Sequence, residues 1–186
     1  MKIVFLLEEP SMKDALDGIL PRLIPGVNFQ CIPHQGKQDL EKSIPRKLRG
    51  WREPDVHFVI VRDQDSSDCV VLKNHLHELC QKAGRPEALV RIACHELEAW
   101  FLGDLVAVET ALGLSGLAKQ QLNKRFCNPD NILNPAQELK KLVPRYQKGI
   151  GARRIGPHLN LINPGSHSLM VFLQGVKQIA QDYNKP

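Results

Sequence analysis

Four short apolar runs that alternate with single amphipathic helices constrain the fold more than any other feature of the sequence. The runs cover residues 2–7, 27–32, 56–61 and 88–94, and the third is almost wholly β-branched or aromatic. A single helix between successive strands predicts right-handed crossovers, which join parallel strands. We therefore expect an α/β fold with a mainly parallel four-stranded sheet and helices on both faces.

The second part of the chain differs in pattern and in charge. After Glu109 the sequence reads as helical and is interrupted by Pro and Gly, with a last helix over about residues 168–183. Residues 1–109 carry 14 Lys and Arg against 17 Asp and Glu, whereas residues 110–186 carry 11 against 3. We predict an α/β core at 1–109 and a basic, mainly helical part at 110–186 packed on the same domain.

The charge division favours one class of function. An acidic half that binds cations, joined to a basic half that meets phosphates, suits a metal-dependent phosphodiester enzyme, although a basic solvated face gives the same composition. The apolar start reaches only from Ile3 to Leu7, too short for a signal-peptide core, so we expect a cytoplasmic protein with no membrane association. The five cysteines are scattered and odd in number, and we interpret them as structural thiols.

Acidic residues follow three of the four expected strands. Glu8 follows the first, Asp63 and Asp65 follow the third, and Glu96 and Glu98 follow the fourth. In open α/β sheets the ligand site lies beyond the carboxyl ends of the strands. Residues two apart on an extended chain point the same way, so Asp63 and Asp65 are expected to face one ion.

Carboxylates gathered in this way repel one another unless a hard divalent cation such as Mg²⁺ or Mn²⁺ binds them. The alternative is helix capping, which we accept for Asp68 before the third helix and for Glu9 before the first. If residues 95–98 stay extended, Glu96 and Glu98 face one way; if they are helical, only one points into the site. Trp100, just after them, is interpreted as a core residue.

Basic residues cluster in the second part of the chain. From Leu139 to Arg154 there are six of them and no acid. Cationic donors beside a phosphodiester would offset the charge that develops as the bond breaks. A solvated helix face is the alternative. The candidates for phosphate or nucleic-acid binding are Lys148 and Arg153 first, then Lys140, Arg145 and Arg154.

These motifs resemble a known domain. An acid after the first strand and an Asp-x-Asp after a later strand resemble the Toprim domain of topoisomerases, primases and overcoming-lysogenization-defect nucleases. More closely, the chain is similar to the Toprim-like domain-of-unknown-function family 4276. The segments that carry this resemblance are Phe5-Leu6-Leu7-Glu8-Glu9-Pro10-Ser11, Val61-Arg62-Asp63-Gln64-Asp65, His95-Glu96-Leu97-Glu98-Ala99-Trp100, Tyr146-Gln147-Lys148, and Ser166-His167-Ser168 before Phe172.

The resemblance implies a Toprim-like (Rossmann-like) fold and a Mg²⁺- or Mn²⁺-dependent phosphodiester hydrolase acting on nucleic acid. By this resemblance, Glu8 would act in acid/base chemistry or hold a metal, and Asp63 and Asp65 would bind the ion. From the positions of the acids after the fourth strand, we expect Glu96 or Glu98 to bind a second ion. Lys148 would join the catalytic residues. Domains of this kind resemble effectors of bacterial phage-defence pairs, and because this chain lacks a phosphate loop, the ATPase would be a separate partner.

Two other interpretations stay open. Toprim motifs usually have Gly after the first Glu and some have an acid four residues on, where this chain has Glu9 and Met12. These departures favour a non-catalytic module that binds nucleic acid or a protein. Asp63-Gln64-Asp65 is also a nucleophile-plus-acid pattern of haloacid-dehalogenase-type phosphatases, which normally carry it on the first strand.

Overall fold

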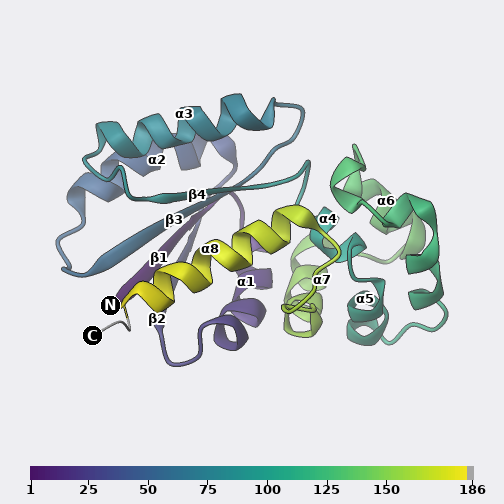
Figure 1. Ribbon diagram of the computed structural model, residues 1–186. Coiled ribbons are helices and arrows are strands. Elements are labelled where there is room, and N and C mark those ends of the chain that lie inside the picture. Colours follow the sequence, from purple (N-terminus) through teal and green to yellow (C-terminus); the bar gives the residue numbers. More distant parts are fainter. Residues whose placement is uncertain (184–186) are drawn as a thin grey trace.

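The computed structural model describes residues 1–183 and contains a four-stranded, fully parallel sheet in the order β2-β1-β3-β4 (Figure 1). The predicted α/β fold with a parallel sheet is therefore confirmed. The two central strands pair in register, with Lys2 opposite Val56 and Leu7 opposite Val61. The strands are β1 (Lys2–Leu7), β2 (Asn28–Pro33), β3 (Val56–Asp63) and β4 (Leu89–Ala93).

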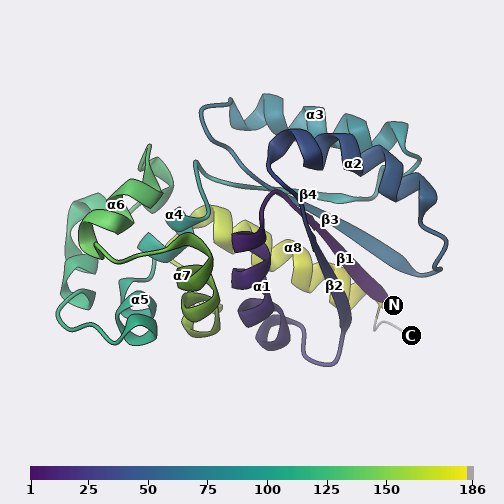
Figure 2. The ribbon, with the colours of Figure 1, turned by 180° about the vertical axis from the view of Figure 1, so that it is seen from behind.

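Helices cover both faces of the sheet, as Figures 1 and 2 show from opposite sides. Alternate residues of β1 enter two separate cores, since successive side chains of a strand point to opposite faces: Phe5 packs toward α1 and α8, and Leu6 toward α2 and α3. Burial on both faces explains why the strands read as continuous apolar runs. The helices are α1 (Pro10–Leu23), α2 (Lys37–Gly50), α3 (Cys69–Lys82) and α8 (His167–Tyr183).

The remaining helices form a lobe beyond the carboxyl ends of the strands (Figure 1). The expected division at residue 109 falls inside α5, and one apolar core joins residues of both parts, such as Leu16 of α1 and Ile155 of α7. No described helix, within residues 1–183, is long and apolar enough to span a membrane. The lobe comprises α4 (Glu98–Leu102), α5 (Leu105–Leu112), α6 (Pro135–Leu142), α7 (Lys148–Ile155) and the 3-10 helices η1 (Ala118–Leu122), η2 (Lys124–Phe126), η3 (Pro129–Asn131) and η4 (Gly156–His158).

Trp100 is a core residue, as the sequence predicts. Its side chain is 1% exposed and packs against Phe172 of α8, with ring centroids 5.2 Å apart. Its indole N–H donates to Ser168 Oγ at 3.0 Å. This hydrogen bond satisfies the one polar group of the buried indole. The Trp100 contacts with Ser168 and Phe172 therefore hold α4 against α8.

Candidate active site

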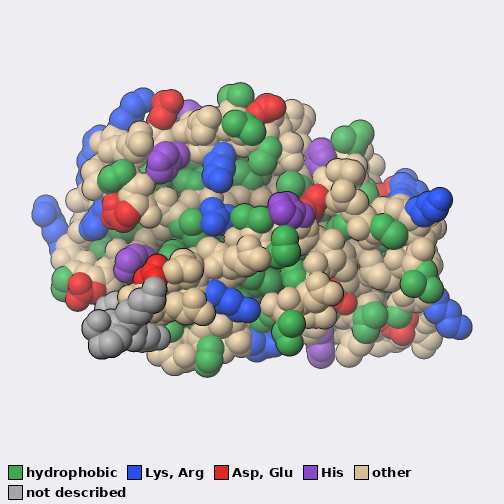
Figure 3. Space-filling model, in the orientation of Figure 1, with side chains coloured by type: hydrophobic (Ala, Val, Ile, Leu, Met, Phe, Trp, Pro, Cys, Tyr) green, Lys and Arg blue, Asp and Glu red, His purple; other side chains and the backbone are tan. Residues whose placement is uncertain are grey.

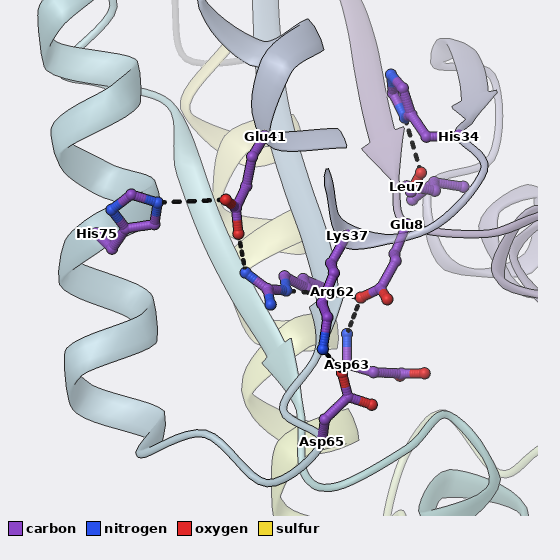
Figure 4. A network of polar contacts seen from close by, with 9 residues as sticks. All are labelled: Leu7, Glu8, His34, Lys37, Glu41, Arg62, Asp63, Asp65 and His75. Carbon is purple, nitrogen blue, oxygen red and sulfur yellow. Dashed lines mark hydrogen bonds and ion pairs between the residues drawn. The ribbon is translucent and has the colours of Figure 1, made fainter. Parts of the chain in front are cut away.

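The ends of β1 and β3 bring Glu8 and Asp63 together. The Glu8 backbone N–H donates to Val61 O at 3.2 Å, which continues the β1–β3 ladder by one bond. The Glu8 carboxylate turns toward β3 and accepts from the Asp63 backbone N–H at 3.1 Å (Figure 4). Residues 55 positions apart are therefore in direct contact at the carboxyl edge of the sheet.

Asp63 is the last residue of β3, and its side chain is almost fully enclosed. The residue is 4% exposed, and within the described chain Oδ1 has no hydrogen-bond partner. Burial, then the negative charge of Glu9, raises the pKa of Asp63 well above its usual range, while Lys148 opposes the shift. A buried carboxylate with an unpartnered oxygen is costly, so this site favours a proton or a cation.

Glu8 shares this electrostatic environment. Burial and the nearby charge of Asp65 raise its pKa, whereas the Asp63 N–H and Arg62 lower it. The Arg62 Nε lies 3.7 Å from Glu8 Oε2, while its Nη1 binds Glu41 on α2. Arg62 is therefore shared between two carboxylates and compensates Glu8 only in part.

Asp65 lies differently from what the sequence predicts. Because β3 ends at Asp63 and Asp65 has φ +53°, the chain is no longer extended there, and the rule that residues two apart point the same way does not hold. The Asp65 carboxylate is 37% exposed and pairs with Lys37 Nζ at 3.4 Å (Figure 4). Its backbone N–H donates to His95 O at 2.8 Å, and His95 also has a positive φ. Two strained residues thus lock the β3 and β4 loops together.

Glu96 and Glu98 point to different places, which resolves the open question about this segment. The α4 helix begins at Glu98, and Glu96 turns away to accept the Ala136 N–H at 2.8 Å, at the start of α6. Glu98 is fully buried, accepts from the Tyr146 hydroxyl at 3.0 Å, and keeps Oε2 without a described partner. Burial raises its pKa. Glu98 therefore joins Glu8 and Asp63 in what we call the acidic cluster, and Glu96 has a helix-capping contact instead.

Lys148 is the one predicted phosphate-binding residue that the fold brings to this cluster. It begins α7, and its Nζ lies 2.7 Å from Glu9 Oε1. Burial lowers the pKa of Lys148, but the negative charges of Glu98, Glu9 and Asp63 outweigh burial and raise this pKa above its usual value. Lys148 therefore stays charged among three carboxylates.

The other predicted basic residues lie elsewhere. Arg153 pairs with Asp14 on α1 at 2.8 Å. Lys140, Arg145 and Arg154 are exposed, and none of the described contacts links them to the acidic cluster. Phosphate binding by Arg153, Lys140, Arg145 and Arg154 stays a prediction, although only Lys148 of the five candidates has a described contact with a residue beside the acidic cluster.

Two residues of the site were missed by sequence reasoning. Glu9 was expected to cap α1, and this expectation is wrong for its side chain: Glu9 occupies the N-cap position but makes no side-chain capping bond, and its carboxylate accepts from Lys148 and Ser11 instead. Tyr146 holds Glu98, and its ring lies so close to Gly151 that a Cβ there would come within 2.1 Å of Cε2. The Glu8-Glu9 pair and the Tyr146-Gln147-Lys148 segment carried the signal, but a pattern does not show which acid meets which cation. Asp68, in contrast, caps α3 as predicted, accepting two backbone N–H groups.

The donor set suits a hard divalent cation, although the side chains would have to move to bind one. Within residues 1–183, no group of three or more His, Cys, Asp or Glu is arranged so that it could hold a metal ion as it stands. The unpartnered oxygens of Asp63 and Glu98 are the carboxylate donors that Mg²⁺ and Mn²⁺ prefer. Release of Asp65 from Lys37 would add a further oxygen beside Glu8.

Comparisons with known proteins identify the family and the fold of the chain. A domain of unknown function, DUF4276, matches residues 7–176. The chain belongs to this family. As a DUF4276 protein it shares its fold with the C-terminal region of the OLD protein of Xanthomonas campestris pv. campestris, with 17% identity, a TM-score of 0.54 and 98% of each chain covered. The C-terminal region of the Burkholderia pseudomallei OLD protein is similar too, with 17% identity, a TM-score of 0.51 and 97% of each chain covered. No curated protein matches the DUF4276 chain.

Proposed function

We propose that the chain is a Mg²⁺- or Mn²⁺-dependent phosphodiester hydrolase that acts on nucleic acid. The observation that supports this most is the pair of buried, unpartnered carboxylate oxygens on Asp63 and Glu98, beside Glu8 and a charged Lys148. Such an arrangement is unstable without protons or a cation. The family resemblance to Toprim nucleases and the fold shared with the OLD C-terminal regions support the same proposal.

We assign each residue of the site a role that follows from its surroundings. Glu8, Asp63 and Asp65 would hold the ion, and Glu98 would serve a second one. The bound metal would polarise the phosphoryl oxygens and lower the pKa of a bound water. Glu8, whose pKa burial and Asp65 raise above its usual value, would be a stronger proton acceptor than an ordinary carboxylate. Lys148 lies within reach of the same carboxylates and would neutralise charge on the phosphate.

The direct test is cleavage of labelled single-stranded DNA, duplex DNA and RNA with Mg²⁺, Mn²⁺ or EDTA. Asp63→Asn should lose activity, because it removes a charged ligand without changing the size of the side chain. Asp68→Asn is the matched control, since Asn caps a helix as well as Asp does and Asp68 lies on the exposed end of α3. Equal, metal-dependent cleavage by the wild type and Asp63→Asn would rule out the assigned site.

The predicted partner ATPase is part of this proposal. Sequence resemblance to defence effectors is its support, and the chain has no phosphate loop of its own. The measurement is cleavage with and without ATP and a genomically neighbouring ATPase, when one exists. Cleavage that is unaffected by any such protein would leave a self-sufficient hydrolase.

A second candidate is a non-catalytic nucleic-acid or protein-binding module. The ion pairs Lys37–Asp65 and Arg62–Glu8 favour it, because they compensate two of the carboxylates without a metal. This alternative predicts salt-sensitive binding that is the same in EDTA and in Mn²⁺. The hydrolase predicts turnover that stops in EDTA.

A further inference from the structure

Two cavities adjoin each other beside the carboxyl edge of the sheet. The first, which we call the acidic-side cavity, has a volume of about 550 Å³ and is formed by the β3–α3 loop and the β4–α4 turn, with Asp65 and His95 in its wall. The second, the basic cavity, also has a volume of about 550 Å³ and lies against η2 and α6. Leu133 and Asn134 line both cavities. The two cavities therefore adjoin each other at these two residues, and together we call them the groove.

The charges differ along this groove. The acidic-side cavity is lined by Asp65 and Glu96 and, within the described chain, by no Lys or Arg. The basic cavity is lined by three cationic side chains and one acidic one, Glu138, so its lining carries a net charge of +2. In the space-filling view, Lys and Arg side chains stand at the end of the molecule that α6 occupies (Figure 3). The three cations are Lys124, Arg125 and Lys141.

Glu138 organises two of these cations. It is 7% exposed and lies at the inner side of the cavity. Arg125 Nη2 lies 2.5 Å from one of its oxygens, and Lys141 Nζ lies 2.6 Å from the other. A buried carboxylate between two exposed cations fixes their positions and leaves their outer N–H groups free to meet an anion.

Side-chain amides fill the space between the cations. Asn134 precedes α6, and its side chain makes no capping bond; Glu96 accepts the Ala136 N–H instead. Amide side chains can pair with the edges of bases, and those edges are open to a protein in single strands. The exposed amides of the basic cavity are Asn128, Asn131, Asn134 and Gln137.

We propose that this groove binds a single strand of nucleic acid and leads it to Asp65, at the carboxyl edge of the sheet. Lys124, Arg125 and Lys141 contact backbone phosphates, the amides contact bases, and the strand passes Leu133 and Asn134 to reach Asp65. The direction of the strand toward a scissile bond rests on the proposed hydrolase; the binding itself does not. Lys124 and Arg125 lie outside the basic segment from Leu139 to Arg154 that the sequence analysis selected, whereas Lys141 lies within it.

The test is the binding of a fluorescent 12-nucleotide single strand, measured by anisotropy in EDTA over a salt series. The groove variant carries Lys124→Gln, Arg125→Gln and Lys141→Gln. The logarithm of the association constant falls as the logarithm of the salt concentration rises. Removal of three phosphate contacts should make this slope less negative by about 2, since each contact on a single strand contributes about −0.7. At 0.1 M salt that slope change corresponds to roughly 100-fold weaker binding.

A control variant with the same loss of charge lies on α2 and α3, away from the residues that line the groove. Lys42→Gln, Arg46→Gln and Lys73→Gln remove three exposed cations from α2 and α3. This variant should bind the single strand as the wild type does, and melting temperatures verify that both triple variants fold. An equal loss of affinity in the two variants would show binding by net charge alone and overturn the groove.

The outcomes separate this proposal from the proposed function. If the wild type binds the single strand, the groove variant does not, and neither protein cleaves it, then binding in the groove is supported and the proposed hydrolase activity is refuted. Metal-dependent cleavage that is equal in the wild type and the groove variant keeps the hydrolase and overturns the groove. Binding of duplex DNA as tightly as of the single strand would also overturn it, as would a loss of binding caused by Lys140→Gln with Arg145→Gln and Arg154→Gln instead.

Discussion

Replacement of Asp63 by Asn should stabilise the metal-free protein. The Asp63 side chain is buried, has an unpartnered oxygen and has a pKa that burial and Glu9 raise. At neutral pH the wild type must bind a proton there or carry a poorly compensated charge. An Asn of the same shape removes that cost, and its amide N–H groups lie among carboxylates that accept hydrogen bonds. We expect a gain of about 1–3 kcal/mol, the usual cost of one unsatisfied buried polar group.

The assay is urea unfolding and thermal unfolding in EDTA and in 10 mM Mn²⁺. For a chain of this length a gain of 1 kcal/mol corresponds to about 2–4 °C in Tm. Mn²⁺ should reverse the order: at 100 times its Kd, an ion that binds only the native state adds about 2.7 kcal/mol to the wild type. Asp63→Asn should lose most of that gain, and Asp68→Asn should behave as the wild type in both conditions.

Two results would refute this reasoning. A lower stability of Asp63→Asn than of the wild type in EDTA would mean that the carboxylate is well compensated in the native state. An equal Mn²⁺-induced shift in both proteins would mean that the ion binds somewhere other than at Asp63.

Three further predictions follow from the same geometry. The stability gain of Asp63→Asn in EDTA should shrink as the pH falls from 8 toward about 4. The reason is that a carboxyl whose pKa is raised in the native state destabilises that state only at pH values above the pKa of the unfolded chain. A gain that is constant in urea titrations across this range would contradict the raised pKa of Asp63. Gly151→Ala should cost about 1–3 kcal/mol, because the new methyl would overlap the Tyr146 ring, whereas Gly149→Ala in the same helix should be neutral or stabilising in the same unfolding assay. Lys148→Gln should slow cleavage about 100-fold and change Mn²⁺ affinity, measured by calorimetry, far less; the reverse pattern would make Lys148 a residue that only organises the metal ligands.

The fold was predictable because its strands are buried on both faces. Apolar runs such as Val56–Val61 must lie inside a sheet, and the single helices between them leave few topologies. The structure differs mainly at the ends of elements: β3 continues two residues further, to Asp63. The boundary at residue 109 falls inside α5, because the helical lobe begins earlier than the change in charge.

The site was predictable where backbone geometry alone decides it. Glu8 and Asp63 meet because parallel strands in register end at the same edge. Asp65 and Glu96 could not be placed, because each follows a turn in which one φ value redirects the side chain; Asp65 itself and His95 both have a positive φ. The Glu9–Lys148 contact joins residues 139 positions apart and depends on how α7 packs on α1, which no local pattern encodes.

We propose that the carboxyl edge of the sheet holds a divalent cation. The most direct measurement is anomalous diffraction at the manganese absorption edge from a crystal grown with Mn²⁺. We expect a peak bonded to carboxylate oxygens of Glu8, Asp63 and Asp65, with Asp65 released from Lys37. A well-ordered crystal with no peak there, and with Asp65 still paired with Lys37, would contradict it.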